Sequence, residues 1–338
     1  MSFKRLDPED FLVSSDAITS TMWSTNLPSL STFFTSSIQE ASSAGNFYLS
    51  IFQTGSTLSN AEVQFEIAYA DSLGSGSSLY NSAVSGLSPT KTIYGQYRSL
   101  ILEDENSNFI FGKGNNIHTT NNFWAISLER ARYKQNLLPG SLNLTLSGSG
   151  IQTLYLTDDS VDNPVSQFLG STRVYQLISG SNGTAGNLAD SGYVLGSGSY
   201  GLVFPDLGTI LLNPAAISES INLSPSRTDN SDGFNNRKLF TAISGAASFT
   251  ANSQETLTSD YVFVRARNSE FNYSENPSFI SGSTGEVIYN QFINAPQVYL
   301  TTIGMYNDSN ELVAVAKMSR PLLKDFTKEA LVRVKLDF

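Results

Sequence analysis

The final segment of the chain, residues 330–338, alternates between apolar and polar side chains with a period of two. This spacing is the period of a half-buried β-strand and does not fit the 3.6-residue period of a helix. The charged residues of the segment share one side of the expected strand. On the other side, the apolar positions are Ala330, Val332, Val334, Leu336 and Phe338. We therefore expect residues 330–338 to form a strand that is tied into a sheet at its very end.

A second β pattern lies immediately before this strand. Two largely apolar runs, residues 299–306 and 311–317, are separated by the tetrad Asn307-Asp-Ser-Asn310. Asn, Asp and Ser readily adopt turn conformations, so residues 298–317 are predicted to form a hairpin. Residues 260–338 thus contain the strongest β patterns of the chain.

Apolar runs with strand character recur through the rest of the chain. Residues 47–53 and 62–69 predict another hairpin, in which one face of the second strand is exposed to water. Further strand-like runs are residues 97–102, 108–111, 122–128, 142–147, 151–156, 172–178, 192–195, 208–212 and 261–267. Turn residues separate many of these runs at a spacing typical of sandwiches and barrels. The predicted fold class is mainly β, with antiparallel sandwich-like or barrel-like modules and few short helices.

Composition and pattern divide the chain into four regions. Residues 1–45 predict an N-terminal arm or helical segment, because Asp7-Pro-Glu-Asp10 resembles a helix start whereas the following Ser- and Thr-rich stretch suits extended structure equally well. Residues 46–147 predict a first β domain. Residues 148–259, rich in Gly and Ser, predict a second β domain or an insertion. Residues 260–338 predict C-terminal strands that complete the main β domain.

The charge balance and the residue types that are missing exclude several classes of function. The formal net charge is −10 and only 15% of the residues are charged, so phosphate-neutralising contacts to nucleic acid are not expected. The chain has no cysteine, which excludes disulfides, cysteine-based zinc sites and thiol catalysis. No apolar run approaches membrane-spanning length, and the N-terminus lacks the apolar core of a signal peptide. We expect synthesis in the cytoplasm without membrane insertion.

Three sequence patterns suggest a cofactor-binding, catalytic or metal-binding site, and each has a simpler structural explanation. Gly196–Gly201 matches G-x-G-x-x-G, but the apolar run 202–205 that follows contains Pro and does not suit the helix that a dinucleotide loop requires. His118 is the only histidine, and we expect it in an exposed loop. The acidic stretches 157–162 and 229–233 lack the spacing of a calcium loop and read as turns. We therefore predict no catalytic residue, no cofactor and no metal site.

Several stretches together resemble an uncharacterised class of virion structural proteins of large contractile-tailed phages, especially phages of marine cyanobacteria. The stretches are residues 15–20, 62–70, 73–80, 93–98, 129–134, 265–277, 299–308, 312–317 and 333–338. The resemblance implies a non-enzymatic structural subunit of a tailed-phage virion, made in the host cytoplasm. Within the particle we place it in the baseplate, as a wedge or wedge-periphery protein. Its partners are then other baseplate or tail proteins and copies of itself, without nucleic acid.

Two other functions remain open. A tail-tip receptor-binding or glycan-binding protein would present exposed aromatic rings on Gly-Ser loops, for which Tyr193 and Tyr200 are candidates. A neck or capsid-associated position in the particle is equally compatible with the resemblance. A depolymerase requires paired carboxylates, and no pair stands out among the 30 acidic residues.

With this resemblance, we interpret residues 260–338 as the anchoring sheet of an assembly subunit. The residues expected to contact neighbouring subunits lie in this sheet. Arg320, Arg333 and Lys335 are candidates for pairing with acidic neighbours, and Phe338 is the terminal residue of the apolar face. The N-terminal region is a candidate arm that becomes ordered only on assembly, because it lacks a clear hydrophobic period.

Overall fold

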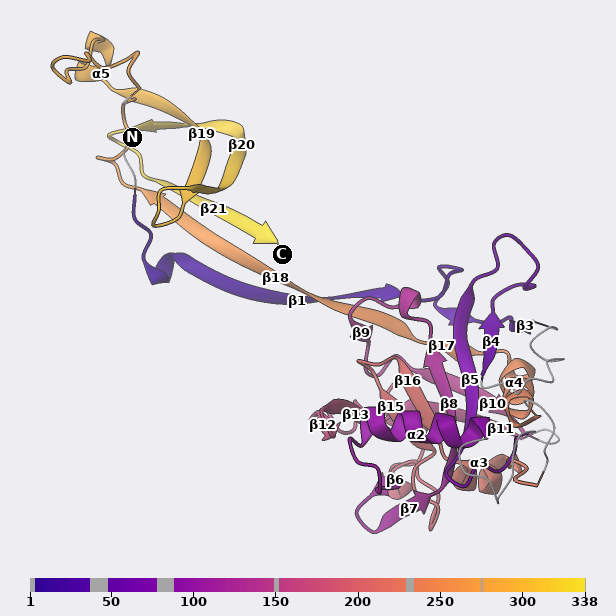
Figure 1. Cartoon of the computed structure of the whole chain (residues 1–338). Coiled ribbons are helices and arrows are strands. Elements are labelled where there is room, and N and C mark those ends of the chain that lie inside the picture. The colour runs from indigo at the N-terminus through magenta and orange to yellow at the C-terminus, as the bar shows by residue number, and fades with distance from the viewer. Residues whose placement is uncertain are drawn as a thin grey trace. The chain divides into compact units, whose positions relative to one another are not determined.

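The computed structural model describes residues 4–36, 48–77, 88–148, 152–228, 234–274 and 276–337 (Figure 1). The chain divides into two compact units. Unit 1 comprises Met1–Ala17 and Thr256–Phe338, and unit 2 comprises Ile18–Glu255. The regions 46–147 and 148–259, which the sequence suggests as separate modules, both contribute strands to unit 2. Unit 2 is therefore inserted between the two segments of unit 1.

Unit 2 is built on one large antiparallel sheet, which confirms the predicted fold class and curls into a half-barrel. In spatial order its main path contains β2 (Ser29–Leu30), β17 (Phe249–Thr250), β10 (Asn143–Ser147), β11 (Thr153–Asp158), β13 (Thr172–Ser181), β15 (Gly201–Phe204), β16 (Thr209–Leu212), β8 (Asn122–Leu128), β5 (Val63–Asp71), β4 (Leu49–Phe52) and β3 (Phe34–Thr35). Two short strands, β12 (Gln167–Leu169) and β14 (Thr184–Ala185), also pair with β13. Away from this sheet, β9 (Asn136–Leu137) pairs with residues 253 and 254.

Hydrophobic cores lie on both faces of this sheet, as the alternation along β5 shows. Phe65, Ile67 and Tyr69 belong to one buried cluster, whereas Ala68 and Ala70 belong to the other. The predicted hairpin of residues 47–53 and 62–69 is confirmed by the pairing of β4 with β5. The prediction that one face of its second strand meets water is wrong, because helices cover both faces.

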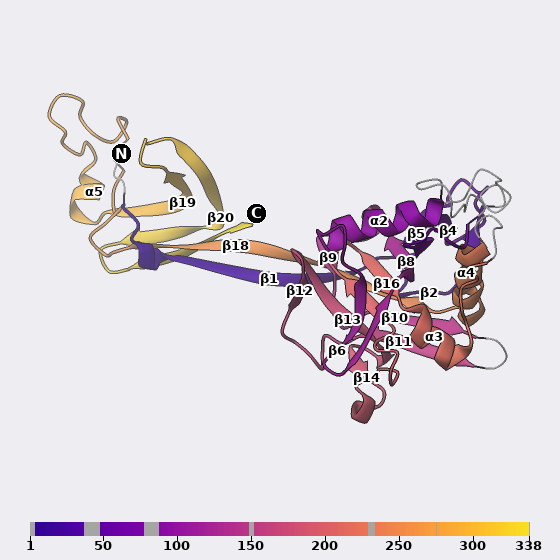
Figure 2. The same ribbon diagram turned by 60° about the horizontal axis from the view of Figure 1, so that its bottom comes forward.

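Helix α2 (Pro89–Ile101) covers one of these faces (Figure 2). It begins with Pro at its first turn, where a missing backbone N–H costs nothing. Ile93, Tyr94 and Ile101 are buried and pack into the cluster that includes Ala68 and Ala70. The strand predicted at residues 97–102 is therefore wrong. On the other face, the buried cluster includes side chains of α3 (Pro214–Ile221) and α4 (Phe234–Ala246).

The N-terminal region contains no sustained helix within the described residues 4–36. The predicted helix start at Asp7 is a single 3₁₀ turn, η1 (Pro8–Asp10), after which the chain extends into β1 (Phe11–Thr21). The Ser, Thr and β-branched residues of this segment favour extended backbone, and β1 gains hydrogen bonds by pairing with β18 (Asn252–Ala266). The helical alternative for residues 1–45 is thus wrong for this segment.

The structure places His118 in a strand and begins another strand at the end of the Gly196–Gly201 pattern. The hairpin of β6 (Phe109–Lys113) and β7 (Asn116–Thr120) contains His118, which is half-buried in a strand rather than exposed in a loop. Gly201, the last glycine of the dinucleotide-like pattern, begins β15, so no helix follows the Gly-rich turn. The strand predicted at residues 192–195 is reduced to an isolated bridge at Val194.

Unit 1 consists of two small sheets. In the first, β18 lies between β1 and β21 (Ala330–Asp337), which confirms the predicted final strand as far as Asp337. Val262 is opposite Val334 in this sheet. The second sheet is the predicted hairpin, formed by β19 (Gln297–Tyr306) and β20 (Leu312–Asp325). A short helix, α5 (Asn290–Asn294), precedes β19.

Candidate assembly surface and candidate binding cavity

Unit 1 buries very little apolar surface of its own. Both large hydrophobic clusters of the molecule consist of unit 2 residues. Apart from Pro296, the buried apolar residues of unit 1, within the described part of the chain, are Val262, Ala266, Ala330 and Val334. These are small side chains, and they lie on one face of the β18–β21 pair. A core of this size is far smaller than the unit that it supports.

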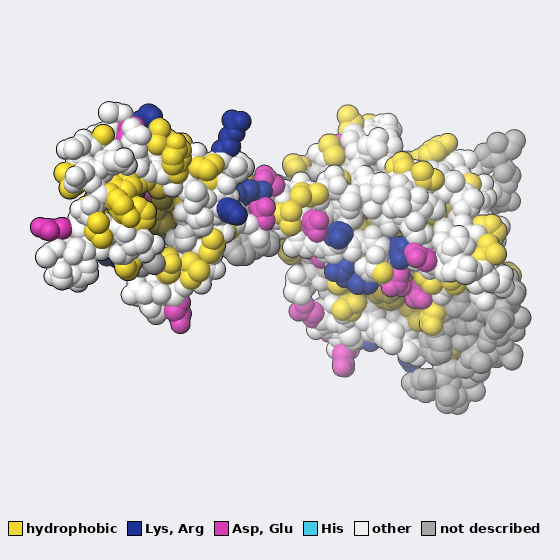
Figure 3. Space-filling model, turned by 90° about the horizontal axis from the view of Figure 1, so that it is seen from above, with side chains coloured by type: hydrophobic (Ala, Val, Ile, Leu, Met, Phe, Trp, Pro, Cys, Tyr) yellow, Lys and Arg dark blue, Asp and Glu magenta, His cyan; other side chains and the backbone are white. Residues whose placement is uncertain are grey.

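The large apolar side chains of unit 1 are exposed instead, and hydrophobic side chains occupy much of its visible face in Figure 3. Those that are at least 38% exposed are Phe11, Leu12, Val13, Tyr273, Ile288, Tyr289, Ile293, Tyr299, Tyr306, Leu312, Val313, Val315, Leu322, Phe326 and Leu331. We call this set the assembly surface. So many large apolar side chains in one unit make it a candidate interaction region, because isolated soluble proteins rarely leave large apolar patches in water.

The hairpin β19–β20 contributes the most regular part of the assembly surface. Along β19 exposed and half-buried side chains alternate, so that Tyr299 is 65% exposed whereas Val298 and Leu300 are half-buried. Each strand pairs only with the other, and each therefore leaves one edge of backbone hydrogen-bonding groups open within the described residues. β19 contains neither a charge nor a proline, the usual residues that block pairing at an open edge.

A buried lysine stabilises the base of this hairpin. Lys324 is 0% exposed, and its ammonium group donates to the carbonyl oxygens of Asn268 and Asp325, each at 3.1 Å. It also donates to Oδ1 of Asn272 at 2.7 Å. A buried ammonium group is tolerated only when its protons are satisfied, and three acceptors satisfy all three.

Three of the four predicted interaction residues are exposed in unit 1. Arg320 lies in a bulge of β20, where residues 318–321 are opposite the single residue Thr301. The guanidinium group of Arg333 lies 5.3 Å from the ring centroid of Tyr261. Arg320 and Arg333 belong to different sheets, so these candidates do not form one cluster.

Lys335 is already partly neutralised within its own strand. Its Nζ atom lies 2.8 Å from Oδ1 of Asp337, and this hydrogen bond raises the pKa of Lys335. The same contact, together with a hydrogen bond from Ser259, lowers the pKa of Asp337. Phe338, the fourth predicted residue, lies outside the described residues.

Unit 2 contains a cavity of about 1000 Å³ next to the β6–β7 hairpin. Its walls come from segments that are distant in sequence: Lys113, Gly114, Asn115, Asn116, Asp159, Asp162, Asn163, Ile178, Ala185, Leu188, Ala189, Ser191, Tyr193, Val194 and Leu195. The walls combine charged, amide, aromatic and aliphatic side chains. This mixture is typical of small-ligand sites, in which a few polar groups fix the orientation of the ligand.

Among the residues that line this cavity, Asp159 is held in place by three hydrogen-bond donors. Its side chain is 2% exposed and lies 2.6 Å from Nζ of Lys113. The same oxygen accepts a hydrogen bond from Nδ2 of Asn163 at 3.0 Å, and the other oxygen accepts from the backbone N–H of Gln176 at 2.8 Å. The ion pair therefore holds Lys113 in place at the wall of the cavity.

Tyr193 lines the cavity, and Tyr200 does not. Burial, together with the negative charge of Asp159, raises the pKa of Tyr193. Tyr193 is half-buried, and its hydroxyl has no hydrogen-bond partner among the described residues. Tyr200 is buried, and its hydroxyl lies 2.7 Å from Oγ of Ser220. The expectation that Tyr200 is an exposed ring on a Gly-Ser loop is therefore wrong.

The acidic stretch 157–162 uses its carboxylates to hold loops together. Asp158 accepts hydrogen bonds from the backbone N–H groups of Gly140 and Ser160, and burial raises its pKa. Asp162 accepts from the backbone N–H of Ala185 at 2.7 Å. No group of three potential metal-binding side chains occurs among the described residues. The second acidic stretch, 229–233, lies outside them.

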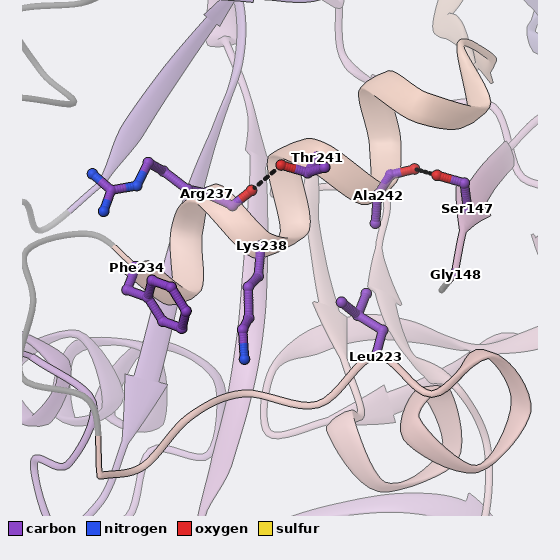
Figure 4. A pocket seen from close by; sticks show the side chains of 8 residues that line it. All are labelled: Ser147, Gly148, Leu223, Phe234, Arg237, Lys238, Thr241 and Ala242. Carbon is purple, nitrogen blue, oxygen red and sulfur yellow. Dashed lines mark hydrogen bonds between the residues drawn. The ribbon is translucent and has the colours of Figure 1, made fainter. Parts of the chain in front are cut away.

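A smaller pocket of about 420 Å³ lies beside α4 (Figure 4). Its hydroxyl groups are already used, because Ser147 donates to the carbonyl oxygen of Ala242 and Thr241 donates to that of Arg237. Lys238 lies 4.8 Å from the ring centroid of Phe234 and donates to the backbone. This pocket offers a ligand fewer unused polar groups than the cavity beside Asp159.

No helix among the described residues has the length and apolar character needed to cross a membrane.

Similarity to known proteins does not identify a family. Comparisons of the chain with protein-family models, with curated proteins and with solved structures find no match.

Proposed function

We propose that this protein is a non-enzymatic structural subunit of a tailed-phage virion, in a baseplate wedge or at the baseplate periphery. Unit 1 is the part that binds other subunits, which are copies of the same chain or neighbouring virion proteins. The observation that carries the assembly role is the assembly surface, which leaves unit 1 with large exposed apolar side chains and a very small core. The sequence resemblance to virion structural proteins supports the placement in a phage particle.

The energetics of burial support an assembly role. Burying a Leu, Val or Phe side chain contributes about 1.5–3 kcal/mol relative to leaving it in water. Unit 1 does not gain this contribution for most of its large apolar residues while it is alone. Permanent subunit interfaces resemble a hydrophobic core divided between partners, and unit 1 has the composition of one such half.

The open edge of β19 suggests how the contact forms. An uncharged edge strand of ten residues is a template for pairing with another strand. We expect a strand of a neighbouring subunit to pair with β19, while Tyr299 and Val315 are covered by the same neighbour. Backbone pairing then supplies affinity, and the exposed side chains supply specificity.

The test compares two double-charge variants of the purified chain by sedimentation velocity and in virion assembly. Tyr299→Lys combined with Val315→Lys places two charges on the assembly surface. We expect this variant to remain monomeric at concentrations at which the wild type associates, and to be missing from particles analysed by mass spectrometry. Val165→Lys combined with Phe168→Lys changes exposed apolar residues of unit 2 and serves as the matched control.

Two results contradict the proposal. Normal association and incorporation of the Tyr299→Lys, Val315→Lys variant shows that the contact lies elsewhere. Absence of the wild-type chain from purified particles removes the virion assignment, even if the chain associates with itself in solution.

A further inference from the structure

The cavity beside Asp159 retains hydrogen-bonding groups that the described part of the chain does not satisfy. The hydroxyl of Tyr193 is unused. Asp162 accepts one hydrogen bond, from Ala185, through Oδ2, which leaves its Oδ1 atom for a ligand. Asn116 accepts from the backbone N–H of Gly196 through Oδ1, which leaves its two amide protons. Donors and acceptors are thus interspersed around one volume.

The charges of the cavity disfavour an anionic ligand. Lys113 and Asp159 neutralise each other at 2.6 Å. The carboxylate of Asp162 would repel an anion such as phosphate or a carboxylate. The other polar groups of the lining are neutral donors and acceptors. A ligand that both donates and accepts hydrogen bonds and carries no negative charge fits this set.

The lining of the cavity also contains aliphatic side chains. It includes Ile178, Leu188 and Leu195, and Leu195 is 90% exposed at a turn closed by the bridge between Val194 and Gly198. A lining that combines aliphatic side chains with polar groups matches a ligand with hydroxyl groups along its edge and C–H groups on its face. Pyranose rings have this property, and a cavity of about 1000 Å³ is at the upper end of the usual range for ligand sites.

We propose that this cavity binds a short neutral oligosaccharide. Tyr193 and Asp162 form hydrogen bonds to its hydroxyl groups, and Lys113, held by Asp159, offers its remaining protons to the same ligand. The aliphatic side chains of the lining, among them Leu195, pack against a ring face. This role goes beyond assembly through unit 1 and does not depend on it, since all cavity residues belong to unit 2.

The test begins with the purified full-length chain on an array of neutral and acidic oligosaccharides. Any sugar that binds is then titrated by calorimetry against conservative variants. Tyr193→Phe removes one hydroxyl and keeps the ring, and Asp162→Asn keeps the acceptor for Ala185 while it removes the charge. We expect each substitution to weaken binding about three- to tenfold, the effect of one lost hydrogen bond.

Tyr155→Phe, a hydroxyl removed from an exposed tyrosine outside the cavity, is the matched control and should leave the dissociation constant unchanged. Thermal unfolding curves that match the wild type show that the variants are folded. The proposal is overturned if no neutral oligosaccharide binds, if only acidic ones bind, or if neither cavity variant weakens binding. Sedimentation of the same variants reports on assembly separately, so each proposal can fail alone.

Discussion

The Nζ atom of Lys324 lies 2.7 Å from the Oδ1 atom of Asn272, and both side chains are buried. This contact joins β20, a strand of one sheet of unit 1, to the loop that follows β18, a strand of the other sheet. Because unit 1 has so small an apolar core, a single buried polar contact carries an unusually large share of its stability.

Lys324→Met is therefore expected to destabilise unit 1 strongly. The substitution keeps the aliphatic stem but leaves the acceptors of Asn268, Asn272 and Asp325 without their donor. Of the three acceptors, Oδ1 of Asn272 is buried, and a buried acceptor left unpaired costs about 1–3 kcal/mol, so we expect a loss of about that size. Hydrogen exchange of residues 268–272 measures this, with faster exchange expected.

Lys328→Met is the control for this prediction. Lys328 is exposed and lies 3.5 Å from Asp325, a surface ion pair of at most about 1 kcal/mol. Equal exchange rates in the two variants would show that burial of Lys324 does not matter.

Deletion of residues 330–338 is expected to prevent incorporation into particles. β21 pairs with β18 from Ala330 to Asp337, so the deletion exposes the central strand of the first sheet and removes Ala330 and Val334 from the small core. Complementation of a phage lacking the gene measures incorporation. Normal particles containing the truncated chain would show that the final strand is dispensable.

Tyr97 is expected to make unit 2 sensitive to alkaline pH. Burial, with a smaller contribution from Glu66, raises the pKa of Tyr97 from 10.0 to about 12. The folded state therefore holds this proton longer than the unfolded state. The resulting stabilisation, about 2–3 kcal/mol, is complete below pH 10 and is lost as the pH rises to 12.

Urea unfolding at a series of pH values from 9 to 12 checks this expectation. Tyr97→Phe keeps the ring against Phe123 and should lose less stability over this range than the wild type. Tyr155→Phe, at an exposed position, should follow the wild-type curve. If the stability of all three proteins fell equally with pH, ionisation of Tyr97 would not be the cause of the loss.

Tyr94→Ala tests the packing of α2 on the sheet. The buried ring of Tyr94 lies 5.8 Å from that of Phe109 and 5.4 Å from that of Phe123, so its removal leaves a cavity. We expect a loss of about 3–5 kcal/mol in the free energy of unfolding. Leu100→Ala, on the exposed side of the same helix, should change it by less than about 0.5 kcal/mol. Similar losses in both would indicate that the helix does not pack as described.

The strands of unit 1 follow from local sequence. The period of two in residues 330–337 and the turn at Asn307 identify β21 and the β19–β20 hairpin without knowledge of their partners. β1 is different, because its partner β18 lies more than 200 residues away in the chain. The sequence of residues 11–21 alone does not identify this partner. The weak pattern of residues 11–21 reflects an exposed strand with no buried face to encode.

The helical spacing of the apolar residues in α2 can be recognised only over a longer stretch of sequence. Residues 97–102 alone resemble a strand, since Tyr and Ile are common in sheets. Over the full helix the buried residues Thr90, Ile93, Tyr94 and Ile101 repeat at helical spacing. This helical spacing is visible over about 12 residues starting at Pro89 and is not visible over the six residues 97–102.

The assembly surface and the cavity differ in how far sequence predicts them. Exposed charges at Arg320, Arg333 and Lys335 are expected from alternation, but the exposure of Tyr299 depends on the absence of a covering layer. The cavity joins residues near 113, 159 and 193, which only the sheet brings together. For the same reason, sequence cannot separate Tyr193, which lines the cavity, from Tyr200, which is buried.

The insertion of unit 2 within unit 1 affects the order of events on the ribosome. β1 emerges early, yet its partner β18 follows only after roughly 240 more residues, about 12–50 s at ordinary translation rates. Unit 2 is complete in the nascent chain before β18 and β21 can join β1. Most of the exposed apolar side chains through which we propose that unit 1 binds other subunits are thus the last to be synthesised, so this contact cannot form before the chain is nearly complete.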